Sequence, residues 1–227
     1  MLALAIACVL SSAPDGSQFR ETSLSGLAIN GPSSLVLHEL EPREVVVAEA
    51  LGLGDYKPVL MVTMPGSGPE RAVFIETPDN AHFELVTRVA KESLQKKYGD
   101  NPAALPSSRP QVTAFIETRV PLTSEMERWV ELGWQAANQA ASLHSGASLR
   151  ASSGTLYDFA SATRGINRIY YIQSKATAPA PDSAGGMLVT LGEMLEAYVA
   201  ANPDQRPALE AKLLELAKKT RSEANLK

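Results

Sequence analysis

The chain has 227 residues, of which 44% are hydrophobic and 20% charged, a composition typical of a globular protein with one large domain or two small ones. Its 21 basic and 25 acidic residues give a formal net charge of −4 without a concentrated basic face, so nucleic acid is not an expected partner. The single cysteine, Cys8, excludes an internal disulfide and a multi-cysteine zinc site. The three histidines show no metal-ligand spacing, so neither a metal nor another cofactor is expected.

The N-terminal segment begins with ten apolar residues, 1–10. A transmembrane helix needs about 20 such residues, so no membrane span is expected. The run resembles the hydrophobic part of a secretory signal but lacks a basic start. An exported location (periplasmic, lumenal or secreted) and a cytoplasmic one, with the run tucked into the core, fit equally well. Residues 11–32 are rich in Ser, Gly and Pro and are expected to form a linker.

The remainder, residues 33–227, is expected to form a single α+β domain. Its first runs are rich in leucine or β-branched residues and predict strands at 34–38 and 44–48. Three consecutive valines in the second run disfavour a helix. Pro42, however, suits the first turn of a helix over 43–51, and this is the alternative.

A hairpin is predicted next, because the apolar runs 57–63 and 71–76 flank the turn sequence Pro-Gly-Ser-Gly-Pro at 65–69. Asn80 can cap a helix that runs to about residue 98 and ends at a glycine. Apolar residues spaced by three and four support this helix at 80–98.

A strand at 111–120 precedes a helix that opens at Ser124 with a capping-box spacing and reaches about residue 143. A second hairpin is predicted over 155–174. The C-terminal segment has two amphipathic stripes with a short break between them, which predicts an antiparallel helical hairpin over 186–224. The predicted fold class is therefore α+β, with a mixed or mostly antiparallel sheet of about six to seven strands packed by helices.

Two predicted strands share four residues, since Phe74-Ile-Glu-Thr77 recurs as Phe115-Ile-Glu-Thr118, each time before a predicted helix. Either a duplicated strand–helix unit or coincidence accounts for this echo. If the two strands run the same way in one sheet, Glu76 and Glu117 end side by side, where ligands of α/β sheets bind. Two such carboxylates can divide into an acid and a base, and His82 can join them. The alternative is that they only solvate the strand ends.

The sequence contains no motif for a serine nucleophile or a phosphate loop. This favours a non-catalytic protein-binding or accessory factor that acts through surface contacts with a protein partner. Leu209, Leu213 and Leu216 form the candidate contact stripe, provided that it extends beyond what the domain itself buries. The alternative is a small hydrolase or transferase that uses the paired glutamates. Oligomeric state and substrate are not predicted.

Overall fold

The computed structural model describes residues 42–53, 57–78, 82–99, 115–144, 154–165 and 168–224. The apolar run at 1–10, the linker at 11–32 and the strand predicted at 34–38 lie outside these ranges. None of the helices in the described part combines the length and the hydropathy that crossing a bilayer requires.

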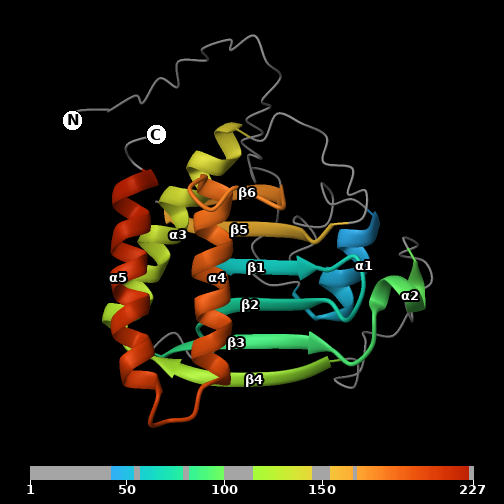
Figure 1. Cartoon of the computed structure of the whole chain (residues 1–227), viewed down its shortest axis with the longest axis horizontal. Coiled ribbons are helices and arrows are strands. Elements are labelled where there is room, and N and C mark those ends of the chain that lie inside the picture. Colours follow the sequence, from blue (N-terminus) through green and yellow to red (C-terminus); the bar gives the residue numbers. More distant parts are fainter. Residues whose placement is uncertain are drawn as a thin grey trace.

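Five helices and six strands make up the described part of the chain (Figure 1). In chain order they are α1 (Pro42–Ala50), β1 (Val59–Met64), β2 (Arg71–Glu76), β3 (Phe83–Ala90), α2 (Leu94–Tyr98), β4 (Phe115–Leu122), α3 (Ser124–His144), β5 (Leu156–Gly165), β6 (Arg168–Thr177), α4 (Ala184–Ala200) and α5 (Arg206–Ala224).

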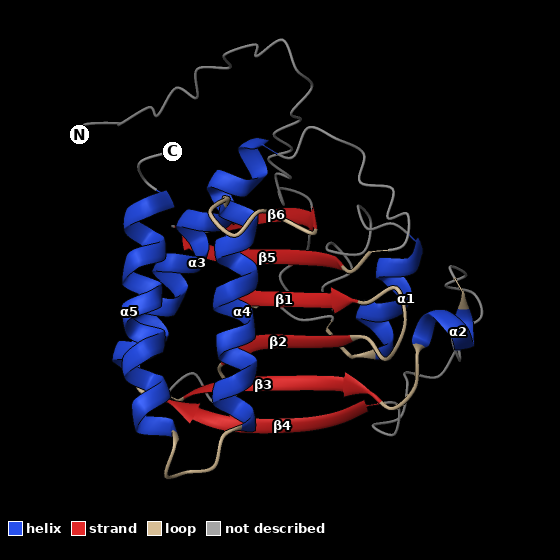
Figure 2. Ribbon diagram, viewed as in Figure 1, coloured by secondary structure: helices blue, strands red, loops and turns tan. Residues whose placement is uncertain are grey.

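The strands form one sheet in the order β4-β3-β2-β1-β5-β6, and every neighbouring pair is antiparallel. Strands β1 to β4 are consecutive neighbours, and β5 then returns to pair with the free side of β1. Figure 2 shows the strands as one continuous layer with α4 crossing in front of it. The predicted α+β class, the antiparallel sheet and the C-terminal helices are confirmed.

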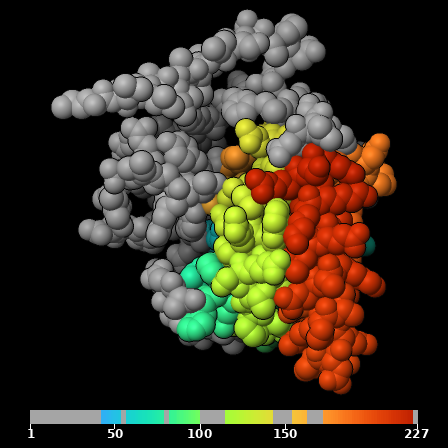
Figure 3. Space-filling view, turned by 90° about the vertical axis from the view of Figure 1, so that its left-hand side faces the viewer, coloured from blue at the N-terminus to red at the C-terminus, as the bar shows by residue number. Residues whose placement is uncertain are grey.

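One face of the sheet is covered by α3 and α4, and α5 packs against these two helices. The three helices share a core with alternate strand residues. The largest of the fully buried side chains there is Trp134 of α3, whose Nε1 donates to the carbonyl of Ala160 at 2.9 Å. Helices α3 and α5 lie side by side (Figure 3). They approach closely at Gly133, where an added Cβ would lie 2.6 Å from the carbonyl oxygen of Ala217. A larger residue at this position would therefore push the two helices apart.

The opposite face of the sheet packs against α1 and α2. Its core joins strand residues such as Phe74 and Val86 to Val46 and Val47 of α1 and Leu94 of α2. Both faces of the central strands are thus buried, whereas the charged side chains of this second face gather towards β4.

The predicted helix at 80–98 is wrong, because residues 83–90 form β3. Leu85 and Val86 are neighbours in sequence and both are fully buried, one on each face of the sheet. A strand buried on both faces loses its alternation of apolar and polar residues, so its spacing imitates that of a helix. Only the end of the prediction holds, since the short helix α2 ends at Gly99, which has a φ of +61°.

The strand predicted at 44–48 is also wrong, and the helical alternative is correct: the segment belongs to α1, with Pro42 as its first residue. Val46, Val47 and Ala50 bury themselves against the sheet at helical spacing. This burial outweighs the modest helix propensity of valine. The Phe-Ile-Glu-Thr echo is therefore not followed by a helix at both positions, because Thr77 precedes the strand β3 whereas Thr118 lies before α3.

The other local predictions are confirmed with small shifts of boundary. The sequence at 65–69 connects β1 and β2, and β5 and β6 form the second hairpin. Helix α3 begins at Ser124, but its cap is Thr123, whose hydroxyl accepts from the N–H of Met126 at 3.3 Å, and not Ser124 as the capping-box spacing predicted. Helices α4 and α5 are in contact as the predicted C-terminal pair. Strand β4 ends two residues later than predicted, and residues 111–114 lie outside the described part.

Candidate functional site

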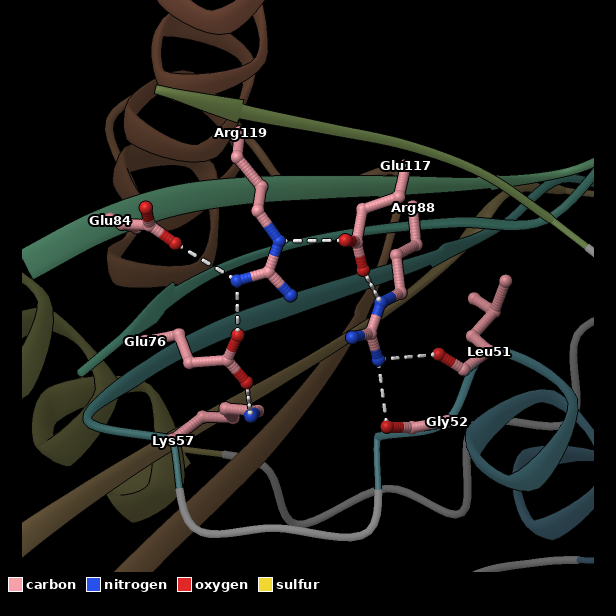
Figure 4. Close-up of polar contacts among 8 residues, drawn as sticks. All are labelled: Leu51, Gly52, Lys57, Glu76, Glu84, Arg88, Glu117 and Arg119. Atoms are coloured by element: carbon pink, nitrogen blue, oxygen red, sulfur yellow. Dashed lines mark hydrogen bonds and ion pairs between the residues drawn. The ribbon is translucent and has the colours of Figure 1, made fainter. Parts of the chain in front are cut away.

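Six charged residues gather on the second face of the sheet and form what we call the β4 charge cluster (Figure 4). Its members come from the residue two before β1 and from the three adjacent strands β2, β3 and β4: Lys57, Glu76, Glu84, Arg88, Glu117 and Arg119. The antiparallel register places Glu76 opposite Glu84, and Arg88 opposite Glu117. Because alternate residues of a strand share a face, all of the strand members point to the same side.

Arg119 is the centre of the cluster. Its Nε donates to Glu117 at 2.6 Å, and its Nη1 donates to Glu76 at 2.7 Å and to Glu84 at 2.9 Å. Lys57, which is only 4% exposed, donates to the other oxygen of Glu76 at 2.5 Å. The guanidinium therefore joins β4 to the two strands beyond it.

Arg88 links the cluster to the end of α1. Its Nε donates to Glu117 at 2.7 Å, and its Nη1 donates to the carbonyls of Leu51 and Gly52 at 2.9 and 2.8 Å. Gly52 has a φ of +65°, which a residue with a side chain rarely adopts. Arg88 thus holds the terminal turn of the helix against the sheet.

The same guanidinium lies between two aromatic rings. The Arg88 carbon Cζ is 5.0 Å from the centre of the Phe74 ring and 4.9 Å from that of Phe115. Contacts of this kind are electrostatically favourable. Arg88 is therefore fixed by three kinds of neighbour, a carboxylate, main-chain carbonyls and aromatic rings, and its position is a structural one.

Both candidate catalytic carboxylates belong to this cluster. Partial burial acts to raise the pKa of Glu76, but the hydrogen bonds and charges of Lys57 and Arg119 outweigh it and leave the pKa below its usual value. The pKa of Glu117 is lowered in the same way, against partial burial, by Arg119 and Arg88. Both groups are ionised near neutral pH, so neither supplies the protonated acid that a pair of catalytic carboxylates requires.

The structure places Glu76 and Glu117 on one face, but not side by side. Glu76 is level with Glu84, whereas Glu117 is level with Arg88, four residues along β3 from Glu84. His82 has an exposed side chain directly before β3, and not in a first helical turn. The sequence suggested that the two carboxylates end side by side, but it did not indicate the arginine that separates and neutralises them.

The candidate contact stripe on α5 is largely turned inwards. Leu213 is fully buried, and Leu209 and Leu216 are half-buried against the core that α5 shares with α3 and α4. These leucines stabilise the helix in its place on the domain.

A second buried polar group was not foreseen from the sequence. Asp158 of β5 is 8% exposed, and the side-chain amide of Gln173 donates to both of its oxygens at 3.0 Å. Burial, together with the nearby charge of Glu44, raises the pKa of Asp158 to about 7. Lys175 of β6 pairs with Glu44 at 2.6 Å and so fastens α1 to this end of the sheet. Here α1 meets the β5–β6 hairpin, which lies more than 100 residues away in the sequence, so no local pattern could have revealed the group.

Helix α3 carries a pair of like charges, Glu127 and Glu131, one turn apart. Partial burial and the neighbouring Glu131 raise the pKa of Glu127 to about 7. The spacing of four residues between two glutamates was a signal available in the sequence.

A hollow lies beside β4 on the face that carries α4. Its volume is about 280 Å³, and its walls include Thr87, Val89, Thr118 and Val199. At its rim the Nε of Arg71 donates to both carboxylate oxygens of Glu196, at 2.9 and 3.0 Å. The charged groups of the hollow therefore satisfy one another, and the remaining wall is neutral.

Ile116 of β4 points to the same face as Thr118 and is 59% exposed. It is the single large hydrophobic side chain that is exposed among the residues the structure describes. We call Ile116, Thr118 and the adjoining hollow the β4 margin. The Phe-Ile-Glu-Thr echo contains Ile116 and Thr118, but the sequence did not indicate that Ile116 is exposed.

Among the described residues, no group of three or more His, Cys, Asp or Glu side chains is arranged to hold a metal ion. Comparisons of the chain with protein-family models, with curated proteins and with solved structures found no match.

Proposed function

We propose that this chain is a non-catalytic protein-binding factor and that the β4 margin is its contact surface. The observation that carries the proposal is the exposure of Ile116 at the outermost strand of the described sheet. A partner that covers this side chain removes apolar surface from water, which is the main favourable contribution to most protein–protein association.

The position of β4 supports the proposal, because it is the last strand in the order of the sheet. A strand at the edge of a sheet offers its main-chain N–H and C=O groups to another extended chain. Strand addition of this kind is a common mode of protein recognition, in which main-chain hydrogen bonds supply affinity and side-chain pockets supply specificity.

The hollow beside Thr118 is suited to be the side-chain pocket that supplies specificity in strand addition. Thr87, Val89 and Val199 give it a neutral, partly apolar wall, and the ion pair between Arg71 and Glu196 needs no further counter-charge. An apolar side chain of a bound protein can enter such a hollow without leaving a charge unpaired.

The charge cluster supports the same conclusion from the other face of the sheet. Its carboxylates are ionised and joined to Arg119, Arg88 and Lys57. A group held in this way stabilises the strands that present the margin, and it has no proton to give to a substrate. The α5 stripe offers less, since Leu213 is fully covered.

The test is site-specific photocrosslinking in cells of the native source. A photoreactive amino acid replaces Ile116 in one variant, and Ala211, exposed on α5, in a matched control. We expect a discrete protein adduct from position 116 and none of comparable yield from position 211. An equal yield at both positions, or adducts at 211 alone, contradicts the proposal.

A further inference from the structure

We infer that the β4 margin binds a second copy of this chain, with the two β4 strands antiparallel around a twofold axis at Thr118. The inference rests on the proposed function, because it names the partner of the same surface. It follows from three properties of β4: the direction of its main-chain groups, the order of its charges, and the exposure of Ile116.

The direction of the main-chain groups follows from a hydrogen bond of β3. The N–H of Ala90 donates to the carbonyl of Glu70 at 2.9 Å, on the β2 side of the strand. In antiparallel sheets alternate residues turn their main-chain groups to alternate neighbours. The main-chain N–H and C=O groups of Thr87 therefore point to β4, and those of its partner Thr118 point back to β3.

By the same alternation, the N–H and C=O groups of Phe115, Glu117 and Arg119 point away from β3. Pro121 falls in this outward set, where its missing N–H costs the β3–β4 ladder nothing. Within the described sheet, where β4 has a strand neighbour on its β3 side alone, its outer edge consequently presents three complete pairs of donor and acceptor to an approaching strand.

The charges then select one register. With Thr118 opposite Thr118 of the second copy, Glu117 lies opposite Arg119 of that copy, and Arg119 lies opposite its Glu117. Opposite charges in directly facing positions favour a strand pair, and facing threonines favour it as well. A shift towards either end would place Glu117 opposite Glu117, or Arg119 opposite Arg119, and like charges disfavour such pairs.

The selected register also covers the exposed apolar side chain. Ile116 lies opposite Val120 of the second copy, on the face that carries the hollow. Phe115 lies opposite Pro121, whose carbonyl still accepts a hydrogen bond. Strand β4 is therefore complementary to itself, as the twofold symmetry of a homodimer requires.

The register is tested by a cysteine at the proposed axis. In a Cys8→Ser background, Thr118→Cys places two thiols in a facing pair whose Cα atoms are about 4.5 Å apart, within the range of a disulfide. Ile116→Cys is the matched control, because its two copies would be four residues apart along the strands, about 14 Å. We expect mild oxidation to link Thr118→Cys into a dimer and to leave Ile116→Cys monomeric. Equal linkage of both variants, or of neither, overturns the register.

Sedimentation equilibrium tests the dimer without any cysteine variant. We expect the wild-type chain to reach twice its mass of 24.2 kDa as its concentration rises. Ile116→Lys, which places a charge on the margin outside the charge cluster, should keep the mass of one chain and an unchanged circular dichroism spectrum. A wild-type chain that stays monomeric at every concentration overturns the inference. The proposed function survives that result if position 116 still crosslinks to a different protein, and it fails if position 116 crosslinks to nothing.

Discussion

The guanidinium of Arg119 on β4 lies 2.7 Å from the carboxylate of Glu76 on β2, reaching past the whole width of β3. One side chain thus connects three strands at the margin of the sheet. Together with Lys57, which contributes more, it also lowers the pKa of Glu76 against the effect of partial burial.

Replacement of Arg119 by Met should therefore destabilise the fold, by about 1 kcal/mol at pH 7, because the exposed part of the side chain is screened by solvent. A carboxyl group whose folded pKa is lowered stabilises the fold above its unfolded pKa and loses this contribution as the pH falls. The difference between Arg119→Met and its parent should accordingly shrink below pH 4.5, the ordinary pKa of these glutamates. Urea unfolding at pH 7 and at acidic pH measures it.

The control for this experiment is Lys218→Met, which removes an exposed cation 3.7 Å from Glu125. We expect little change in its free energy of unfolding. Both variants are best prepared with Ile116→Lys, so that self-association does not contribute. If Arg119→Met and Lys218→Met change the free energy of unfolding equally, the contacts of Arg119 across the sheet add no stability beyond that of an exposed ion pair.

The buried carboxyl of Asp158 predicts a dependence of stability on pH with the opposite sign. Its folded pKa is raised to about 7 by burial and by Glu44, above the usual value of 3.8. Folding therefore favours the protonated form, and stability falls as the pH rises from about 4 to 7. A rise of the pKa from 3.8 to about 7 corresponds to about 4 kcal/mol, so Asp158→Asn should be more stable than wild type by up to this amount at pH 8, with little gain at pH 4.

Thermal unfolding of Asp158→Asn across this range checks the prediction. The replacement keeps an oxygen that can accept from Gln173. A constant difference between the variant and wild type at every pH would mean that Asp158 does not take up a proton on folding.

Close packing of two helices at Gly133 gives a third prediction. Gly133→Ala would bring a Cβ to 2.6 Å from the carbonyl oxygen of Ala217, a backbone atom that cannot move without shifting α5. We expect a loss of about 1–3 kcal/mol. At Gly192 the new Cβ would instead meet the end of the flexible Met61 side chain. Gly192→Ala should therefore cost distinctly less, and chemical denaturation of the two variants compares them directly.

The buried amide of Asn138 gives a fourth. Its Nδ2 donates to the hydroxyl of Ser161 at 3.0 Å and to the carbonyl of Ile172 at 2.8 Å, and its Oδ1 accepts from Ser174 at 2.5 Å. Asn138→Ala leaves these groups without their partner inside the core, which should cost about 2–4 kcal/mol. Gln139→Ala, at the exposed position next to it, serves as the control and should leave the melting temperature nearly unchanged.

The sequence predicted the elements whose ends carry explicit signals. The turn at 65–69, the start of α3 at Ser124 and the break between α4 and α5 each combine turn or capping residues with a clear apolar period. The two wrong predictions, at α1 and β3, concern segments whose burial decides their structure. Val46 and Val47 favour a strand by their own propensity, but their burial against the sheet stabilises a helix. In β3 the alternation of apolar and polar residues is interrupted because Leu85 and Val86, on opposite faces, are both buried.

Less of the candidate site could be predicted. The echo drew attention to Glu76 and Glu117, but the register that puts Arg119 between them depends on the pairing of β3 with both neighbours. The exposure of Ile116 depends on which strand ends the sheet, and the order of strands is not encoded by any local pattern. Its neighbours in sequence gave no sign that this apolar residue would face outwards.

Hydrogen exchange of single main-chain amides tests the central claim most directly. The amides of Glu117 and Arg119 point outward from β4, so they are protected only while another strand is bound there. Their exchange is measured by NMR on the wild-type chain in two states, alone and with any protein captured through position 116. Both amides should exchange slowly in at least one of these states, and they should exchange rapidly in Ile116→Lys. Rapid exchange of both amides in both states would contradict the assignment of the β4 margin as a protein-binding surface.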